Sequence, residues 1–279
     1  MQITKYLDQY RKDLEFKNYS LNSITNYVSQ VKLFLFSFNK IETEPSRINE
    51  TQIKSWLMES KSINGRKHRI SALKLFYKFT IKQPLKFKYI EYPKSERKLP
   101  LVYSVEEVQK LFNVCENKKH KVILALLYSC GLRVSELINL KWSHIDRSRM
   151  IINIIQAKGK KDRQVMLSPD LIPLLEQYFR EYKSKEYVLN GQSSIQYSAK
   201  SVDQVLKQLA DKAKINKRIY PHLMRHNSFT HMCESGVNIN LIQKLAGHSN
   251  VKTTTIYTHI SHNLISSINS PLNRITLNI

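Results

Sequence analysis

The sequence predicts a mainly α-helical protein with one small antiparallel β-hairpin, built as a helical N-terminal domain and a larger, mainly helical C-terminal domain. Apolar residues recur at helical spacing through most of the chain. β-Branched residues gather in two short runs, 150–155 and 163–167, which are typical of strands. A polar, charged stretch bracketed by Pro93 and Pro100 separates the two helical parts.

The chain is long enough for two domains. Its 279 residues are 42% hydrophobic, which is enough for a core in each part. Charged segments flanked by prolines are typical of linkers, so the stretch Glu91 to Leu101 is the expected boundary. We expect an N-terminal domain of residues 1–92, a linker of residues 93–102, and a C-terminal domain of residues 103–279 that ends in a tail of about residues 263–279.

The first 80 or so residues are expected to form helices. Ser20 is a suitable N-cap for a helix whose apolar positions recur from Ile24 to Phe38. A second helix is expected from Glu50 to Glu59 and a third from about Arg66 to Lys82.

The third helix carries cations on one side and apolar residues on the other. Its lysine stripe consists of Lys67, Lys74 and Lys78. Such a helix suits contact with a phosphate backbone, and we take these lysines as candidate DNA contacts. A solvated lysine face is the equally good alternative. The apolar side consists of Ala72, Leu73, Phe76 and Phe79.

The C-terminal domain begins with a helix that Ser104 and Glu107 cap as a capping box. The almost wholly apolar segment Val122 to Cys130 must be buried, and Gly131 interrupts it. A short helix is then expected from Arg133 to Leu140.

The two β-branched runs are joined by the turn 157–162, so they are expected to form a hairpin with a strongly basic tip. Helices are expected to fill most of the remaining sequence. Gly236 and Gly247 are suitable C-caps for the last two of them. The expected helices lie at 169–184, 198–213, 222–235 and 239–246.

The chain is strongly basic throughout. Lysine and arginine number 45 against 22 acidic residues, a net charge of +23. Because both domains share the excess, it is not a basic tail, and nucleic acid is the expected partner. No apolar run is long enough to span a membrane, and the N-terminus lacks a signal core. We expect a soluble, cytoplasmic protein with no membrane partner, associated with the nucleoid when bound to DNA. Its three cysteines, Cys115, Cys130 and Cys233, are expected to be reduced and buried.

Four segments carry residues suited to chemistry: GLRVSEL (131–137), AKGKKDR (157–163), PHLMRH (221–226) and LAGHSNVKTTTIYTH (245–259). Each is ambiguous alone. Arg133 with Glu136 could be an ordinary helix-surface pair, and Lys158 one more cation on a turn. Tyr257 is one of 15 tyrosines, most of which are expected to be half-buried aromatics.

Together the four segments supply what metal-free cleavage of a phosphodiester needs. Arginine binds two phosphate oxygens and keeps its charge, so Arg133 and Arg225 are candidates to stabilise the transition state. Lys158 on a flexible turn is a candidate general acid for the leaving 5′ oxygen. Tyr257 is the candidate nucleophile, because a covalent intermediate allows rejoining without ATP. His222 is the candidate base and His248 a further donor to the phosphate.

In this order, the four segments resemble the tyrosine recombinase (phage integrase) family, and KNYSLNSITNYVSQVKLFLF (17–36) is similar to the opening of its core-binding domain. The resemblance covers nearly the whole chain and is closest to small bacterial Xer-like and integron-integrase-like recombinases. The ending Ile268 to Leu272 is similar to integron integrases, but the segment 167–221 has no room for their insertion. By resemblance, the catalytic residues are Arg133, Lys158, His222, Arg225, His248 and Tyr257.

The resemblance implies a site-specific recombinase that acts through a 3′-phosphotyrosyl intermediate and a Holliday junction. It implies no cofactor and no metal. The expected partners are a double-stranded DNA site, three further copies of the chain in a tetramer on two sites, and accessory DNA-bending proteins. Lys160, Lys161 and Arg163, at and beside the hairpin tip, are further candidate DNA contacts.

Two positions depart from the family pattern. His144 stands where an aspartate is common, and Asn227 where a serine is usual. Neither position is catalytic in the family, so both are expected to affect local packing.

The C-terminal residues suggest two further features. Four consecutive β-branched residues, 253–256, are a poor choice for a stable helix, so Tyr257 is expected on a weakly held element whose mobility gates cleavage. The tail 274–279 alternates polar and apolar residues, which suits an arm that docks on a neighbouring protomer. A frayed terminus is the alternative.

Three other functions compete. His222 and His226 have HxxxH spacing, but Leu223 stands where a zinc hydrolase of that pattern needs glutamate. A type IB topoisomerase shares the chemistry and acts as a monomer. A DNA-binding module could use the fold without catalysis.

Overall fold

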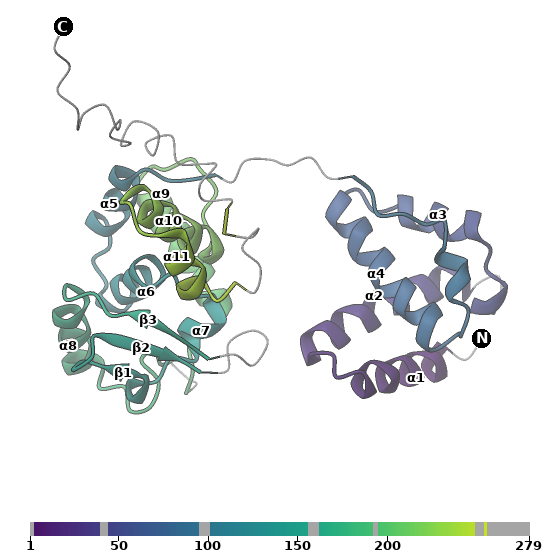
Figure 1. Cartoon of the computed structure of the whole chain (residues 1–279), viewed down its shortest axis with the longest axis horizontal. Coiled ribbons are helices and arrows are strands. Elements are labelled where there is room, and N and C mark those ends of the chain that lie inside the picture. The colour runs from purple at the N-terminus through teal and green to yellow at the C-terminus, as the bar shows by residue number, and fades with distance from the viewer. Residues whose placement is uncertain are drawn as a thin grey trace, which may run out of the picture. The chain divides into compact units, whose positions relative to one another are not determined.

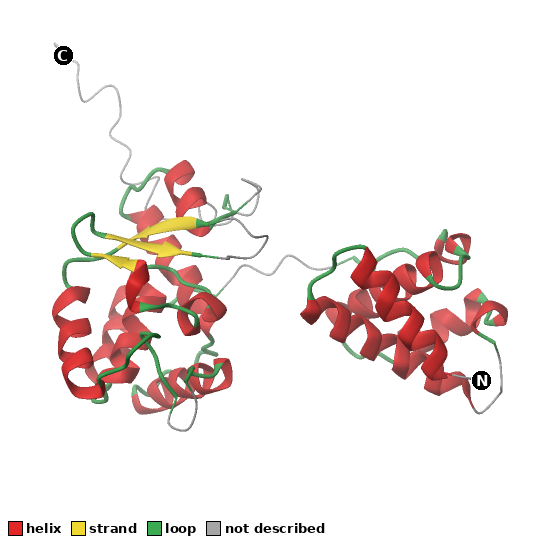
Figure 2. Cartoon of the chain, turned by 90° about the horizontal axis from the view of Figure 1, so that it is seen from below, coloured by secondary structure: helices red, strands yellow, loops and turns green. Residues whose placement is uncertain are grey.

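The computed structural model describes residues 3–39, 44–94, 101–155, 162–191, 195–248 and 254–255. The chain divides into two compact units, Met1–Lys98 and Leu99–Ile279 (Figure 1). Both units are mostly helical, and the second also holds a small sheet (Figure 2). The predicted fold class, mainly α with a small antiparallel sheet, is confirmed.

Across its described residues, the N-terminal unit contains four α-helices. Ser20 caps the second helix as expected, since its Oγ accepts a hydrogen bond from the Ser23 amide at 3.2 Å. The next helix begins with a capping box between Asn49 and Gln52. The helices are α1 (Ile3–Phe16), α2 (Leu21–Asn39), α3 (Glu50–Met58) and α4 (Ile63–Phe79), with 3₁₀ turns at η1 (Pro45–Arg47) and η2 (Pro84–Phe87).

Aromatic side chains build the core of the N-terminal unit. Phe34 lies edge-on to Trp56, with ring centroids 5.1 Å apart, and to Tyr77 at 6.3 Å. Two fully buried tyrosines satisfy their hydroxyls with backbone carbonyls: Tyr10 donates to Ala72 and Tyr77 to Pro45, both at 2.8 Å.

Helix α4 begins at Ile63, three residues earlier than expected, because the Ser62 hydroxyl caps it. It ends at Phe79 rather than at Lys82, which lies outside the helix with a positive φ of 62°. The apolar side of the helix is buried as expected, although Phe79 is only partly so. The lysine stripe borders solvent: Lys78 is exposed, and Lys67 and Lys74 are partly buried.

In its described residues, the C-terminal unit holds seven α-helices, and one of them, α6 (Lys118–Ser129), is buried against four of the others. The seven helices are α5 (Val105–Asn113), α6, α7 (Val134–Ile138), α8 (Leu171–Tyr182), α9 (Ala199–Lys212), α10 (Pro221–Glu234) and α11 (Ile239–Ala246), with a 3₁₀ turn η3 (Trp142–His144). The strands are β1 (Ile145–Asp146), β2 (Ile151–Ile154) and β3 (Arg163–Met166). Ser104 and Glu107 form the expected capping box on α5.

The predicted hairpin is confirmed. Strands β2 and β3 pair antiparallel with Ile154 opposite Arg163, and β1 adds to β2 in the order β1-β2-β3. Strand β1 was not predicted, because it is only two residues long. The hairpin tip, with Lys158, Lys160 and Lys161, lies outside the described residues.

The apolar helix α6 is central to the C-terminal unit, as its composition requires. Every residue from Val122 to Leu127 is buried, and the helix packs against α7, α8, α9 and α10. Gly131 follows with a φ of +57°, and its Cα lies so close to Phe229 that an added Cβ would be 2.6 Å from the ring. This sharp turn places Arg133 at the N-cap position of α7.

The two residues that depart from the family pattern make local contacts. The Asn227 Oδ1 on α10 accepts a hydrogen bond from the Tyr103 amide at 3.2 Å. His231, one turn further along α10, bridges the Tyr103 carbonyl and the Tyr128 hydroxyl. The His144 ring accepts from the Lys141 amide at 3.4 Å and so caps η3.

Replacing Gly131 by alanine should destabilise the C-terminal unit more than the same change at Gly236. Both glycines have positive φ, but the space beside Gly236 is open. We expect Gly236→Ala to cost about 1 kcal/mol of unfolding free energy from backbone strain alone. Gly131→Ala should cost about 2–4 kcal/mol, because overpacking against Phe229 adds to the strain. Urea denaturation followed by Trp142 fluorescence in a Trp56→Phe background measures both; equal losses would contradict the prediction.

Candidate active site

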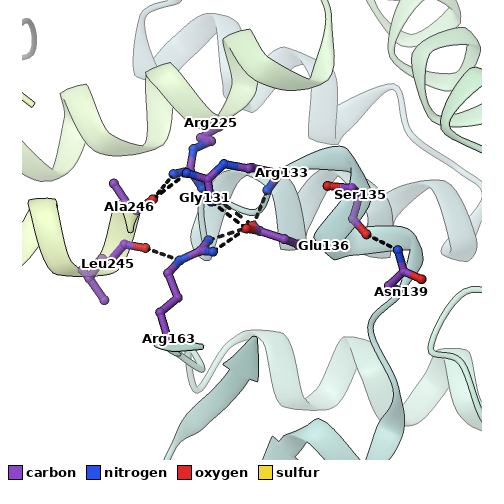
Figure 3. Close-up of polar contacts among 9 residues, drawn as sticks. All are labelled: Gly131, Arg133, Ser135, Glu136, Asn139, Arg163, Arg225, Leu245 and Ala246. Carbon is purple, nitrogen blue, oxygen red and sulfur yellow. Dashed lines mark hydrogen bonds and ion pairs between the residues drawn. The ribbon is translucent and has the colours of Figure 1, made fainter. Parts of the chain in front are cut away.

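A buried carboxylate, Glu136, binds three arginines in the C-terminal unit (Figure 3). Its Oε1 accepts from Nη1 of Arg133 at 2.7 Å and from Arg163, and its Oε2 accepts from Nη2 of Arg163 at 2.8 Å. Arg225 approaches the same carboxylate, with Nη1 3.9 Å from Oε2. We refer to these four residues as the Glu136 cluster.

Separate elements supply the members of this cluster. Glu136 is the third residue of α7, and its Oε2 also accepts the Arg133 amide at 2.7 Å, which closes the first turn of that short helix. Arg163 begins β3, and Arg225 lies on α10. The carboxylate therefore joins a helix start, a strand and a second helix.

The C-terminal end of α11 supplies the remaining acceptors. The Ala246 carbonyl accepts from Nη2 of Arg133 at 3.1 Å and from Arg225, and the Leu245 carbonyl accepts from Nε of Arg163 at 2.7 Å. The last carbonyls of a helix have no intrahelical partner and carry partial negative charge, so they suit guanidinium donors. Gly247 ends the helix with a φ of +60°, and a Cβ there would lie 2.9 Å from Arg163.

The Glu136 cluster carries more positive than negative charge. Burial alone would raise the pKa of Glu136, but hydrogen bonds and charge from Arg163, with hydrogen bonds from Arg133, outweigh it and lower the pKa to about 2. Three guanidiniums thus face one carboxylate that stays ionised. The surplus of positive charge fits a phosphate group, which can bind the arginine forks bidentately.

Three histidines lie beside the arginines. His222 is exposed at the start of α10, and its ring centroid is 4.6 Å from that of His226, one turn later. Burial, with charge from His222 and Arg225, lowers the pKa of His226 to about 4. Burial, with charge from Arg225 and Arg133, lowers the pKa of His248 to about 4. The latter two rings are therefore neutral at physiological pH.

Comparison with known proteins identifies the family. Residues 102–263 match the phage integrase family, and residues 7–84 match the phage integrase N-terminal SAM-like domain. A tyrosine recombinase of Pseudothermotoga lettingae is 36% identical over 251 residues, which cover 86% of this chain and 87% of the relative. Tyrosine recombinase XerC of Bacillus pumilus is 30% identical over 272 residues, covering 88% of each. The chain belongs to the phage integrase family. It is a DNA-binding tyrosine recombinase, an enzyme for site-specific breakage and rejoining of DNA.

Solved structures agree with this assignment. The crystal structure of XerA recombinase is 26% identical, with a TM-score of 0.56, and the match covers 95% of this chain and 96% of that one. A lambda integrase fragment, crystallised as a dimer bound to a core site, has a TM-score of 0.75 and covers 96% of this chain and 98% of its own. At 16% identity, that second match shows the shared fold alone.

The structure of this recombinase brings together four of the six residues proposed for catalysis. Arg133 and Arg225 share the Glu136 cluster. Both arginines and His222 lie close enough to His248 for their charge to lower the pKa of its ring. Lys158 and Tyr257, together with Lys160 and Lys161, lie outside the described residues. The candidate contacts Lys67, Lys74 and Lys78 belong to α4 of the other unit.

Arg163 does not lie where an exposed DNA contact was expected. Its side chain is 6% exposed, and its guanidinium donates to Glu136 and to the Leu245 carbonyl. It was predicted to contact DNA together with the basic hairpin tip. The register instead places it opposite the buried Ile154 and on the same face as the buried Val165, so its side chain points into the interior. We therefore reassign Arg163 to support of the cluster.

Glu136 was expected only as a possible surface partner of Arg133, and its buried position was not predicted. The available signal was its position: Glu136 follows a buried apolar helix and a glycine turn, in a short helix flanked by leucines. A carboxylate in such surroundings needs cationic partners. Its contact with Arg163 joins residues 27 positions apart, which local spacing does not reveal.

In the part of the chain that the structure describes, no three His, Cys, Asp or Glu side chains gather as a metal site. Likewise, none of the described helices is long and apolar enough to cross a membrane. The three cysteines are free and buried, as expected.

Replacing Glu136 by glutamine should destabilise the recombinase in a pH-dependent way. Breaking a buried ion pair costs about 3–5 kcal/mol, and Glu136→Gln should approach that loss at pH 7. Because the folded-state pKa of Glu136 lies below its ordinary value, its contribution is fully present above about pH 4.5 and is lost as the pH falls toward 2. Urea denaturation across this pH range should show the difference between wild type and variant shrinking with acidification.

The matched control is Glu176→Gln, which removes an exposed carboxylate paired with Arg147. That change should cost less than about 1 kcal/mol at any pH. If Glu136→Gln and Glu176→Gln lowered the unfolding free energy equally, the Glu136 cluster would stabilise the protein no more than an exposed ion pair does.

Proposed function

We propose that this recombinase cuts one DNA strand with Tyr257 and holds it as a 3′-phosphotyrosyl intermediate. The observation that supports this most strongly is the convergence of Arg133, Arg225 and His248 on one site with surplus positive charge. Negative charge on the nonbridging oxygens of a scissile phosphate grows in the transition state, and fixed cations stabilise it there.

The remaining roles follow from the chemistry of each side chain. The Tyr257 hydroxyl attacks phosphorus and passes its proton to His222, which is exposed at the start of α10. The 5′ oxygen leaves and takes a proton from Lys158. His248 donates a hydrogen bond to a nonbridging oxygen. No metal or nucleotide cofactor has a part in these steps.

In the conformation described, the arginines proposed to bind the phosphate are largely covered. The side chain of Arg225 is 1% exposed and that of Arg133 21%, and each arginine donates to the Ala246 carbonyl. A phosphate would have to displace this acceptor or the groups that cover the arginines. We infer that DNA binding exposes these donors to the phosphate. Tyr257 lies outside the described residues, and the expected mobility of its segment stays a prediction.

Strand exchange requires more than one protomer. The freed 5′-hydroxyl of one strand would attack the phosphotyrosyl bond of its partner and form a Holliday junction, which a second round resolves. We propose a tetramer on two DNA sites, held by the tail 263–279 docking in trans and assisted by DNA-bending proteins. The outcome (integration, excision, inversion or dimer resolution) would depend on how the sites are arranged. We propose that the enzyme acts in the cytoplasm and is associated with the nucleoid while bound to DNA.

The two units have different proposed roles in DNA binding and catalysis. We propose that residues 1–92 bind the DNA site, residues 93–102 link the units, and residues 103–279 carry out catalysis. In the N-terminal unit, Lys74 and Lys78 on α4 are at least partly accessible to a phosphate backbone. Lys160 and Lys161 would add contacts at the hairpin tip.

Neutralising a lysine of the α4 stripe should weaken DNA binding and its salt dependence. Each lost phosphate contact lowers the slope of log affinity against log salt by about 0.9. We expect this for Lys67→Gln, Lys74→Gln and Lys78→Gln, measured by fluorescence anisotropy over a salt series. The control is Lys54→Gln in the same unit, an exposed lysine that pairs with Glu50. A change in slope equal to that of the control would show that the lysine stripe does not contact DNA.

Trapping the covalent intermediate tests the proposed function. Wild type and Tyr257→Phe are incubated in EDTA with nicked fragments of the DNA flanking the native gene, and products are separated on a denaturing gel. A protein–DNA adduct with wild type alone supports the proposal, and full adduct yield with Tyr257→Phe contradicts it. Arg133→Ala should retain DNA binding and lower the adduct rate at least about 100-fold, the usual cost of losing a transition-state donor.

A further inference from the structure

The hydroxyl of Thr254 contacts the ring of His248. The Thr254 side chain is fully buried, and its Oγ1 lies 3.0 Å from Nδ1 of His248. Thr254 also lies three residues before Tyr257, at most about 10 Å of extended chain. One hydrogen bond therefore joins the phosphate-facing histidine to the segment that leads to the proposed nucleophile.

The His248 ring can serve as a donor to phosphate in one tautomer only. Buried beside Arg133 and Arg225, it is neutral at physiological pH, so just one of its two nitrogens carries a proton. A hydroxyl can either donate or accept. If Thr254 donates to Nδ1, the ring proton must lie on Nε2, where it can be offered to an anion.

The backbone around His248 holds the ring for this contact. Gly247 turns the chain at the end of α11, and the His248 carbonyl accepts from Nε2 of Gln243 at 3.1 Å. The backbone that carries the ring is thereby held by α11, and the hydroxyl of Thr254 contacts Nδ1 of the ring itself.

We propose that Thr254 is a positioning residue for strand cleavage: its hydroxyl donates to Nδ1 of His248 and so directs the Nε2 proton toward the scissile phosphate. This inference rests on the proposed function, since it assigns His248 as the phosphate donor. The same bond holds the start of the Tyr257 segment against the site. Thr254 would thus link the phosphate donor to the placement of the nucleophile.

Three variants separate positioning from packing. Thr254→Val keeps the buried shape and removes the hydroxyl, and Thr254→Ser keeps the hydroxyl. Thr230→Val is the matched control, because Thr230 is a buried threonine of α10 whose hydroxyl has no hydrogen-bond partner among the described residues. Band shifts with DNA should be unchanged in all three.

The first measurement needs no activity. In protein with ¹⁵N-labelled histidine and no DNA, the His248 ring signals, assigned with His248→Gln, should show protonated Nε2 and unprotonated Nδ1 in wild type and Thr254→Ser. Thr254→Val should show a mixture of tautomers. A wild-type ring protonated on Nδ1, or a ring state unchanged by Thr254→Val, overturns the proposal.

The second measurement is the single-turnover rate of adduct formation. We expect Thr254→Val to lower it about 10-fold, with Thr254→Ser and Thr230→Val within 2-fold of wild type. In a His248→Gln background, Thr254→Val should have no further effect, and an undiminished 10-fold effect there would contradict coupling through the ring. If the proposed function itself is wrong, the adduct assay gives a different result, because Tyr257→Phe would then form adducts as wild type does.

Discussion

Glu136 is a buried carboxylate that holds three guanidiniums together, and the proposed active site depends on that interaction. Without a central negative charge, Arg133, Arg163 and Arg225 would repel one another in surroundings of low polarity. With it, a net positive charge can be kept buried and oriented before any DNA arrives. Preorganised charge of this kind is what stabilises a transition state without reorganisation during the reaction.

The fold serves this cluster by bringing distant segments to one point. Helix α6 is buried on all sides, so its end is fixed, and the Gly131 turn places Arg133 against α10 and α11. Helix α11 then presents its last carbonyls to the same arginines. Stability and chemistry therefore share the same contacts, with Arg163 and Glu136 supporting the residues proposed to touch the phosphate.

Much of this arrangement could be predicted from the sequence, because the signals are local. The capping box at Ser104, the apolar run of α6 and the glycine that ends α11 each depend on a few neighbouring residues. The order of Arg133, His222, Arg225 and His248 in recognisable segments was enough to propose the site. Contacts between segments were not predictable: the inward direction of Arg163 depends on strand register, and the bond from Thr254 to His248 depends on a turn in a run of β-branched residues.

The proposed role of the Glu136 cluster is tested most directly by a crystal structure of the Tyr257→Phe variant bound to an uncleaved duplex that contains the site located by adduct mapping. We expect the nonbridging oxygens of the scissile phosphate to accept hydrogen bonds from Arg133, Arg225 and Nε2 of His248. Glu136 and Arg163 should remain paired beneath them. A scissile phosphate bound away from the Glu136 cluster, with both arginines still directed to the α11 carbonyls, would contradict it.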